Sequence, residues 1–268
     1  MTTSGAFEML LFHRDVAFSK ACLNGGAGGL IVDLETRGKA VRQDGFDTQI
    51  SVHDLHDLEA AKSIPGAHVL CRINGPGPDT TREVADVLAA GADEIIFPMI
   101  RHPDEAKALV DAVAGAARVT LMVETVEALA CVADLCALPT DRIYVGLNDL
   151  QISLGTSSIF DVMQDGRLDA IRTDVQGVEF GFGGITLRGK GSPLPVRHLV
   201  GALARLDADF TFLRRSFYRD VEGRDPVLSL RQMHEDMQIA RTRAPGQVAA
   251  DHNAMRAAVQ GVLVAEHG

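Results

Sequence analysis

The sequence predicts a single (β/α)₈ barrel, and two observations carry that prediction. Eight apolar, β-branched runs recur along the chain, each followed by a segment of helical period. The length of 268 residues also matches one barrel, which typically needs about 250 residues. Runs that are apolar on both faces and separated by helices indicate parallel strands covered by helices, and eight such units fit a closed barrel better than an open sheet.

The predicted strands and helices alternate from the N-terminus onward. The strands are Glu8–Phe12, Gly29–Glu35, His68–Asn74, Glu94–Ile100, Val119–Thr125, Arg142–Asp149, Glu179–Leu187 and Phe210–Phe217. The helices are Asp15–Asn24, Asp54–Lys62, Thr80–Ala90, Pro103–Ala114, Val126–Leu138, Asp161–Gln176, Pro195–Leu206, Pro226–Arg243 and Gln247–Glu266. A Pro-Gly break after Ala244 divides the chain into a barrel domain, residues 1–245, and a C-terminal helix, residues 246–268. That helix can pack on its own barrel or cross to a neighbouring subunit.

Composition and charge favour a soluble cytoplasmic protein. The formal net charge is −10, whereas a protein that binds nucleic acid or an anionic membrane usually presents a basic face. The N-terminal residues lack a secretory signal pattern, and no run approaches the roughly 18 apolar residues of a membrane-spanning helix. The four cysteines form no CxxC pair, so reduced thiols are expected.

Two carboxylates, Glu124 and Asp149, are the strongest candidates for chemistry. The active site of a barrel forms at the C-terminal ends of its strands, and both residues end predicted strands one strand–helix unit apart. The two carboxylates would repel each other unless a hard cation lies between them, and magnesium is commonly held by one or two protein carboxylates. The alternative is that each carboxylate caps the following helix.

Arg72, on the neighbouring third strand, is the candidate cation of the site. A guanidinium beside a metal suits a developing enolate oxygen or a substrate carboxylate. The alternative is a buried ion pair with Asp33 or Glu35, and both roles are compatible.

Five short motifs follow one another at barrel-like spacing. They are Ile31-Val-Asp-Leu-Glu35, Cys71-Arg-Ile-Asn74, Gly91-Ala-Asp-Glu-Ile-Ile-Phe-Pro98, Met122-Val-Glu-Thr125 and Gly146-Leu-Asn-Asp-Leu150. Together they resemble the HpcH/HpaI aldolase and citrate lyase β-subunit family, over roughly residues 29–155. The resemblance implies a magnesium- or manganese-dependent lyase that acts on pyruvate-like, oxaloacetate-like or acyl-CoA substrates.

The resemblance also implies roles for single residues. Glu124 and Asp149 would carry the metal, Arg72 would lie beside the substrate keto oxygen, and amides near Asp149, including Asn148, would help hold the substrate carboxylate. The metal would act as a Lewis acid and lower the barrier to an enolate, which adds to or is released from an aldehyde-like electrophile. Relatives are often dimers of trimers with exchanged C-terminal helices, so a homo-oligomer, trimer or hexamer, is expected.

The proton-transfer residue departs from the family pattern. Many members have a histidine directly after the glutamate of the second-strand motif, whereas this chain has Thr36. The general base is therefore open among Glu35, His13, a metal-bound water and the substrate itself. The basic residues that follow, Arg37 and Lys39, would clamp an anionic group of the co-substrate or lie in a solvated loop.

Two later basic segments are further candidates. The segment Arg188-Gly-Lys-Gly-Ser192 would close over an anionic ligand or form a plain mobile loop. Arg214 and Arg215 end the eighth predicted strand, near where barrels often bind phosphate, or pair with Asp209 or Asp220.

The leading prediction is a metal-dependent aldolase or carbon–carbon lyase. Its partners would be a 2-oxo acid and an aldehyde-like or anionic co-substrate, with no nucleic acid and no membrane. The alternatives are a CoA-ester lyase of the citrate-lyase type and a non-catalytic barrel that acts as a binding module.

Overall fold

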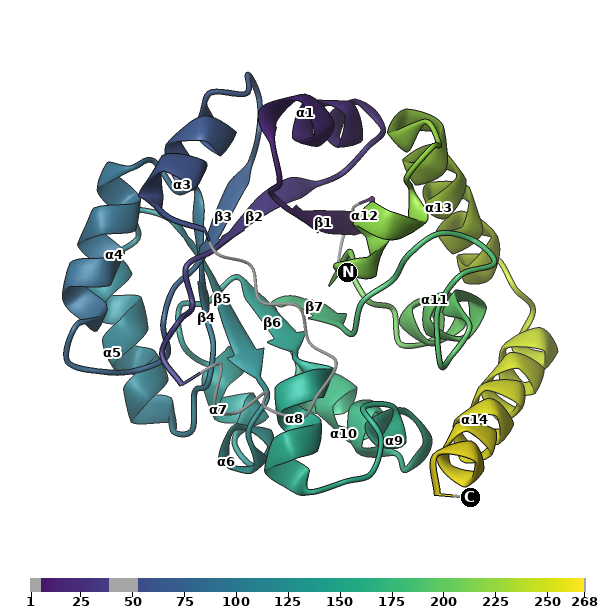
Figure 1. Cartoon of the computed structure of the whole chain (residues 1–268). Helices are drawn as coiled ribbons and strands as arrows, with labels where there is room; N and C mark the ends of the chain where they lie inside the picture. The colour runs from purple at the N-terminus through teal and green to yellow at the C-terminus, as the bar shows by residue number, and fades with distance from the viewer. Residues whose placement is uncertain (1–5, 39–52, 268) are drawn as a thin grey trace.

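The computed structural model describes residues 6–38 and 53–267, with side chains as far as residue 262. Eight strands form one closed barrel, in which each strand runs parallel to the next and β8 pairs with β1 (Figure 1). They are β1 (Glu8–Phe12), β2 (Gly29–Asp33), β3 (Val69–Arg72), β4 (Glu94–Phe97), β5 (Arg118–Val123), β6 (Arg142–Val145), β7 (Glu179–Phe182) and β8 (Phe210–Phe212). The predicted (β/α)₈ barrel is confirmed.

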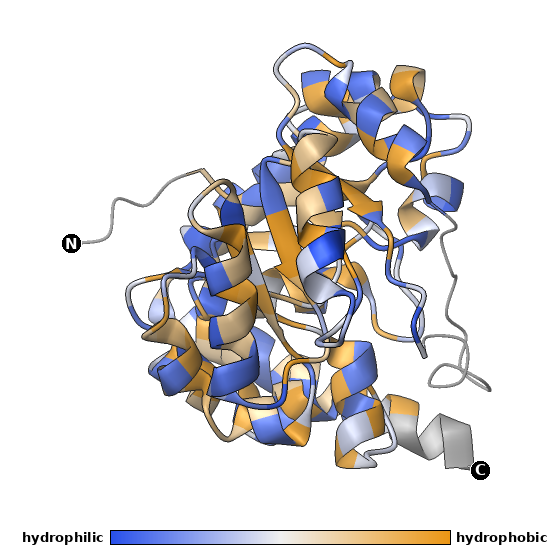
Figure 2. Ribbon diagram, turned by 90° about the vertical axis from the view of Figure 1, so that its left-hand side faces the viewer, coloured by the Kyte–Doolittle hydropathy of each residue, from blue (hydrophilic) through white to orange (hydrophobic). Residues whose placement is uncertain are grey.

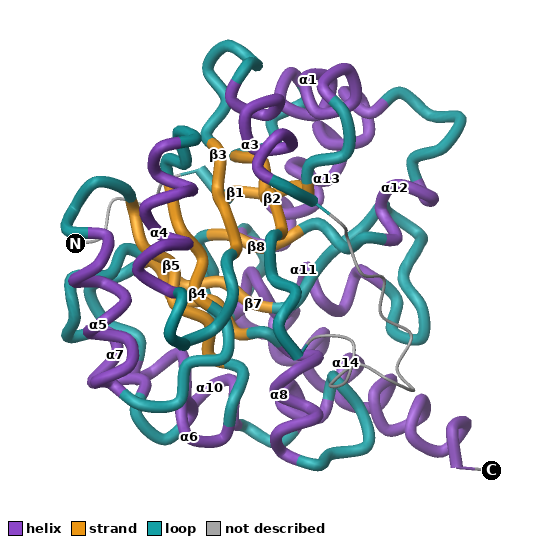
Figure 3. Tube along the Cα trace, turned by 60° about the vertical axis from the view of Figure 1, so that its left-hand side comes forward, coloured by secondary structure: helices purple, strands orange, loops and turns teal. Residues whose placement is uncertain are grey.

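The helices surround the strands, as Figure 3 shows with the strands in orange and the helices in purple. They are α1 (Val16–Asn24), α3 (Leu55–Lys62), α4 (Thr80–Ala89), α5 (Pro103–Val113), α6 (Val126–Leu129), α7 (Val132–Cys136), α8 (Leu147–Leu154), α9 (Asp161–Gln164), α10 (Arg167–Asp174), α11 (Val196–Arg205), α12 (Ser216–Asp220), α13 (Pro226–Arg241) and α14 (Pro245–His267). Several begin at an aspartate that accepts a backbone N–H, as Asp15 does from Phe18 at 2.8 Å.

The predicted strands are too long at their C-terminal ends. The error that matters most for the site is in the sixth strand, predicted to reach Asp149, because β6 ends at Val145 and the helix α8 begins at Leu147. Leu147 and Leu150 are buried at helical spacing, and this short apolar run can be mistaken for a strand. The predicted helix Asp161–Gln176 is divided in turn, because Gly166 adopts a left-handed conformation with φ 88°.

Apolar side chains form two layers, one inside the barrel and one between the strands and the helices. The inner layer consists of Leu10, Phe12, Ile31, Leu70, Ile96, Met122, Tyr144, Phe210 and Phe212. Figure 2 shows the strands as a mainly apolar centre under helices with polar outer faces. The barrel interior is therefore packed, and ligands must bind at its mouth. No helix in the described part of the chain is both long enough and apolar enough to cross a membrane.

The C-terminal helix α14 lies beside the barrel (Figure 1), where it contacts α11 and α9 of its own chain. Met255 and Val259 are buried, at 2% and 0% exposed. Exchange of this helix between subunits stays a prediction.

Candidate active site

A cavity of about 980 Å³ opens at the C-terminal end of the barrel. Its wall includes residues that follow β5, β6, β7 and β8, and it reaches Phe12, Met122, Tyr144 and Phe212 of the inner apolar layer. This is the end at which barrel enzymes place their active sites. Glu124, Asp149, Asn148 and Arg72 all line it.

Glu124 follows β5 and is only 2% exposed. Its Oε1 accepts the backbone N–H of Met99 at 2.8 Å, and a side chain at Gly146 would collide with its Oε2. The glycine after β6 thus leaves room for the carboxylate. Burial raises the pKa of Glu124 to about 8, and the charges of Asp149 and Glu35 add to the rise.

Asp149 lies in the first turn of α8 rather than at a strand end. The N-cap of α8 is Gly146. The helix after Glu124 is α6, and its N-cap is Thr125, whose hydroxyl accepts the Ala128 N–H at 3.1 Å. The alternative prediction that Glu124 and Asp149 cap the following helices is therefore wrong. Both carboxylates face the cavity instead.

The donor set at Glu124 and Asp149 fits a hard divalent cation. Magnesium commonly takes one or two protein carboxylates, with water and substrate oxygens completing its octahedron. In the part of the chain that the structure describes, no three His, Cys, Asp or Glu side chains are grouped to hold a metal. Two carboxylates in an open cavity thus fit a cation with free coordination positions better than a closed zinc site.

Arg72 enters the same cavity from β3 and is held by Asp33. Its Nε and Nη2 donate to the two Asp33 carboxylate oxygens at 2.9 and 2.7 Å, and Glu35 Oε2 lies 3.6 Å from Nε. Burial lowers the pKa of Arg72, but the charges of Asp33 and Glu35 outweigh it and raise the pKa overall. The ion pair predicted as the alternative is present, and Arg72 nevertheless lines the cavity.

The comparisons with known proteins decide the family. The model for HpcH/HpaI aldolase/citrate lyase matches residues 14–167, more than half of the chain. The chain belongs to this family. No curated protein matches it at a significant level.

Solved structures show the same fold. An HpcH/HpaI aldolase/citrate lyase family protein from Burkholderia cenocepacia J2315 is 17% identical, with 89% of this chain and 96% of that chain covered and a TM-score of 0.58. The citrate synthase SbnG is 17% identical, with 87% and 96% covered and a TM-score of 0.60. RipC from Yersinia pestis is 14% identical, with 90% and 98% covered and a TM-score of 0.55.

Two candidate bases of this HpcH/HpaI family member, Glu35 and His13, are buried and are not among the residues that line the cavity. Glu35 is 2% exposed, and its charge reaches both Arg72 and Glu124. His13 is buried and shares a hydrogen bond with the Ser19 hydroxyl at 2.9 Å; burial and then the charge of His53 lower its pKa. The residue that acts as base stays a prediction.

The loop after β2 is tied to its neighbour. The N–H groups of Thr36 and Arg37 donate to Asn74 Oδ1 at 2.9 and 2.7 Å, and Arg37 Nη2 lies 3.4 Å from Asp79 and 3.5 Å from Glu83. Lys39 lies outside the described residues. The roles of Arg37 and Lys39 in substrate binding stay predictions.

Sequence reasoning missed the aromatic floor of the cavity and the backbone donor at Met99. Tyr144 stacks on Phe212, with ring centroids 3.7 Å apart, and its hydroxyl donates to Gly183 O. Met99 adopts a left-handed φ of 57°, a strained conformation for this residue. The alternation of inward side chains along β6 could have revealed Tyr144, but nothing in the sequence pattern indicates the Met99 conformation.

Proposed function

We propose that this protein is a divalent-metal-dependent aldolase or carbon–carbon lyase that acts next to a pyruvate-like 2-oxo acid. The observation that carries the proposal is the meeting of Glu124 and Asp149 in one cavity beside Arg72. Membership of the HpcH/HpaI aldolase/citrate lyase family supports a lyase. We further propose a cytoplasmic homo-oligomer.

Glu124 and Asp149 would hold Mg²⁺ or Mn²⁺. When bound, such a cation supplies Lewis-acid chemistry toward the ketone and carboxylate oxygens of a 2-oxo acid. Glu124 must lose its proton to bind a cation, and its raised pKa makes that loss dependent on pH near neutrality.

Arg72 would stabilise negative charge on the substrate oxygen. Asp33 engages Nε and Nη2, and no described residue accepts a hydrogen bond from Nη1. Because Asp33 fixes the guanidinium plane, Nη1 can donate to a keto oxygen without loss of the ion pair. The exposed Asn148, on the cavity wall, would add a hydrogen bond to the substrate carboxylate.

The apolar floor would keep water from the reacting carbon. Phe12, Tyr144 and Phe212 leave little polar surface beneath the site, and the Tyr144 hydroxyl is already engaged by Gly183. Burial also raises the pKa of Tyr144, so it stays protonated and is not the general base.

The test measures exchange of the pyruvate methyl hydrogens with D₂O and condensation of pyruvate or oxaloacetate with a panel of aldehydes. Hydrogen exchange and condensation are both expected to occur with Mg²⁺ or Mn²⁺ and to disappear with EDTA and in Glu124→Gln. Both should persist in Glu127→Gln, a control in the adjoining helix α6. Acetyl-CoA with oxaloacetate, and citrate, test the CoA-ester alternative. If no 2-oxo acid reacts and calorimetry detects no Mn²⁺ binding, the proposal fails, and the alternative of a non-catalytic binding module is favoured.

A further inference from the structure

The active-site cavity has two walls of opposite charge. Glu124 and Asp149 form the acidic wall, next to Arg72 and the aromatic floor. On the other side, the loop after β7 contributes Lys190, and the segment after β8 contributes Arg214, Arg215 and Arg219. The proposed metal chemistry uses the acidic wall alone, so the basic wall has no assigned role.

Arg214, in the basic wall, is held by backbone carbonyl groups and an aromatic ring. Its N–H donates to Ile185 O and its Nε to Gly184 O, both at 2.8 Å, and its guanidinium lies 5.7 Å from the centre of the Phe160 ring. A side chain at Gly184 would place its Cβ 3.0 Å from Arg214 Cγ. Because Gly184 has no side chain, there is room for the Arg214 side chain to extend into the cavity.

Arg214 carries a charge that no carboxylate of a described residue compensates by contact. Neighbouring cations are paired: Arg215 with Asp33 at 2.9 Å, and Arg188 Nε with Asp236 at 3.0 Å. Among the described residues, Arg214, Lys190 and Arg219 make no ion pair. The nearest acidic group in the wall is Asp220, which accepts the Thr186 hydroxyl at 2.6 Å.

The predicted pairing of Arg214 with Asp209 or Asp220 is therefore absent. Asp209 accepts the backbone N–H of Phe180 at 2.8 Å instead. An arginine that is half-buried without a partner is costly unless a ligand supplies the negative charge.

The loop that carries Lys190 is anchored at both ends. Arg188 is fixed to Asp236, the Lys190 N–H donates to Leu187 O at 3.0 Å, and Lys190 O accepts the Val196 N–H at 2.9 Å. Gly189 and Gly191, with φ of 75° and 98°, form the turn that places Lys190 on the cavity wall.

We infer that Arg214, with Lys190, binds a carboxylate or phosphate on the electrophilic co-substrate, at the end remote from its carbonyl. This inference rests on the proposed function. Nε of Arg214 is engaged by Gly184, which leaves the two terminal nitrogens as a fork that fits carboxylate or phosphate oxygens. The cavity of about 980 Å³ has room for a 2-oxo acid at the acidic wall and a second anionic substrate at the basic wall.

The test compares matched aldehydes that differ only at the remote end. Glutaric semialdehyde against pentanal tests a carboxylate, and glyceraldehyde phosphate against glyceraldehyde tests a phosphate. With pyruvate and Mn²⁺, kcat/KM is expected to be higher for the anionic member of at least one pair. Arg214→Gln is expected to lower that value roughly 10- to 100-fold, the size of one charged hydrogen bond, and to leave the neutral aldehyde unchanged.

Two further variants complete the test. Arg197→Gln removes an exposed cation of helix α11 that does not line the cavity, so it should leave both aldehydes unchanged. Lys190→Met, on an exposed loop position, should reduce the preference for the anion even if Arg214→Gln folds poorly.

Exchange of pyruvate hydrogens without aldehyde separates this inference from the proposed function. Wild type and Arg214→Gln are expected to exchange alike. If the wild type shows no exchange, the proposed function fails, and this inference with it. If exchange persists but neither Arg214→Gln nor Lys190→Met alters the preference for the anionic aldehyde, this inference alone is overturned.

Discussion

Glu94 and Glu124 are buried glutamates on neighbouring strands, at opposite ends of the barrel, and their surroundings shift their pKa values in opposite directions. Glu94 is 0% exposed at the start of β4. Its pKa is lowered even though burial opposes this, because hydrogen bonds from His68 and Thr120 and the charges of Arg142 and Arg118 outweigh the burial. Glu124 meets further carboxylates, and its pKa rises.

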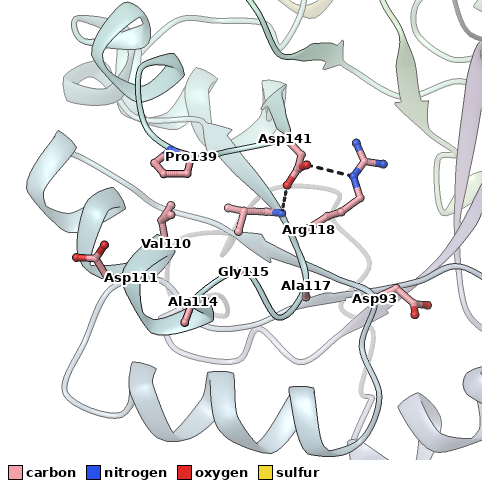
Figure 4. A pocket seen from close by; sticks show the side chains of 10 residues that line it. Asp93, Val110, Asp111, Ala114, Gly115, Ala117, Arg118, Pro139 and Asp141 are labelled. Carbon is pink, nitrogen blue, oxygen red and sulfur yellow. Dashed lines mark hydrogen bonds and ion pairs between the residues drawn. The ribbon is translucent and has the colours of Figure 1, made fainter.

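The bottom end of the barrel is a closed ionic network. Arg142, which is 0% exposed, lies 2.7 Å from Glu8, 3.4 Å from Glu94 and 2.5 Å from Glu179. A smaller pocket at this end, of about 690 Å³, is shown in Figure 4. It contains Asp141, whose Oδ1 lies 3.5 Å from Arg118 Nε and whose Oδ2 accepts the Val119 N–H at 2.7 Å. Its charges satisfy one another, which is typical of a structural face.

This difference indicates that the bottom end of the barrel serves stability and that the top end serves ligand binding. At the bottom, the buried carboxylate of Glu94 lies within 4 Å of His68, Arg118 and Arg142. At the top, Glu124 and Asp149 lie in one cavity, and burial together with the charge of Asp149 raises the pKa of Glu124. Perturbed carboxylates in a cavity indicate function more often than stability.

The largest expected effect is on stability at the bottom end. Arg142→Met should lower the free energy of unfolding by roughly 3–5 kcal/mol, because it removes the buried guanidinium that Glu8, Glu94 and Glu179 share. Urea unfolding measures this. Lys107→Met, which breaks the exposed pair with Asp111, is the control and should change stability by less than about 1 kcal/mol. Similar losses in the two variants would mean that the buried network is no stronger than a surface pair.

The next effect is on activity at the top end. Arg72→Lys keeps a positive charge near Asp33 but loses the guanidinium fork, so kcat should fall roughly 10²- to 10³-fold, as for loss of one oxyanion donor. Steady-state kinetics of the condensation measure this, with urea unfolding as a check on the fold. Unchanged kcat would show that Arg72 serves only the ion pair.

The two ends should also differ in how pH affects stability. In the metal-free protein, folded Glu124 keeps its proton up to a pKa of about 8, against an ordinary value of 4.5, so its ionisation should make unfolding easier as pH rises through that window. Glu94 has a lowered pKa, so its contribution should be present above 4.5 and be lost as pH falls.

Urea unfolding in EDTA across this pH range measures both contributions. Glu124→Gln should gain stability relative to wild type as pH rises, whereas Glu94→Gln should lose stability at every pH above 4.5. Parallel curves for wild type and Glu124→Gln would refute the raised pKa.

The smallest expected effect concerns whether the C-terminal helix α14 packs on its own barrel or is exchanged with a neighbouring subunit. If α14 is exchanged between subunits, a chain that ends at Pro245 should form a smaller assembly in light scattering. Unchanged mass would reject the exchange. Since α14 buries Met255 and Val259, truncation should lower the melting temperature in either case.

The sequence by itself determined the fold class and the metal-site candidates. Eight apolar runs alternating with helical periods indicate parallel strands covered on both faces, and in a chain of this length they fit a closed barrel better than an open sheet. The barrel rule then pointed to Glu124, Asp149 and Arg72, all of which line the cavity.

Only the tertiary structure decided how charges pair and where the strands end. Arg72 and Arg215 come from distant strands yet share Asp33, while Arg214, next in sequence to Arg215, makes no ion pair with a described residue. Asp149 lies on a helix because Gly146 ends the strand early. Sequence spacing fixes the periodicity of side chains along an element, but distances between elements follow from packing, and those distances decide which charged side chains pair and which line the cavity.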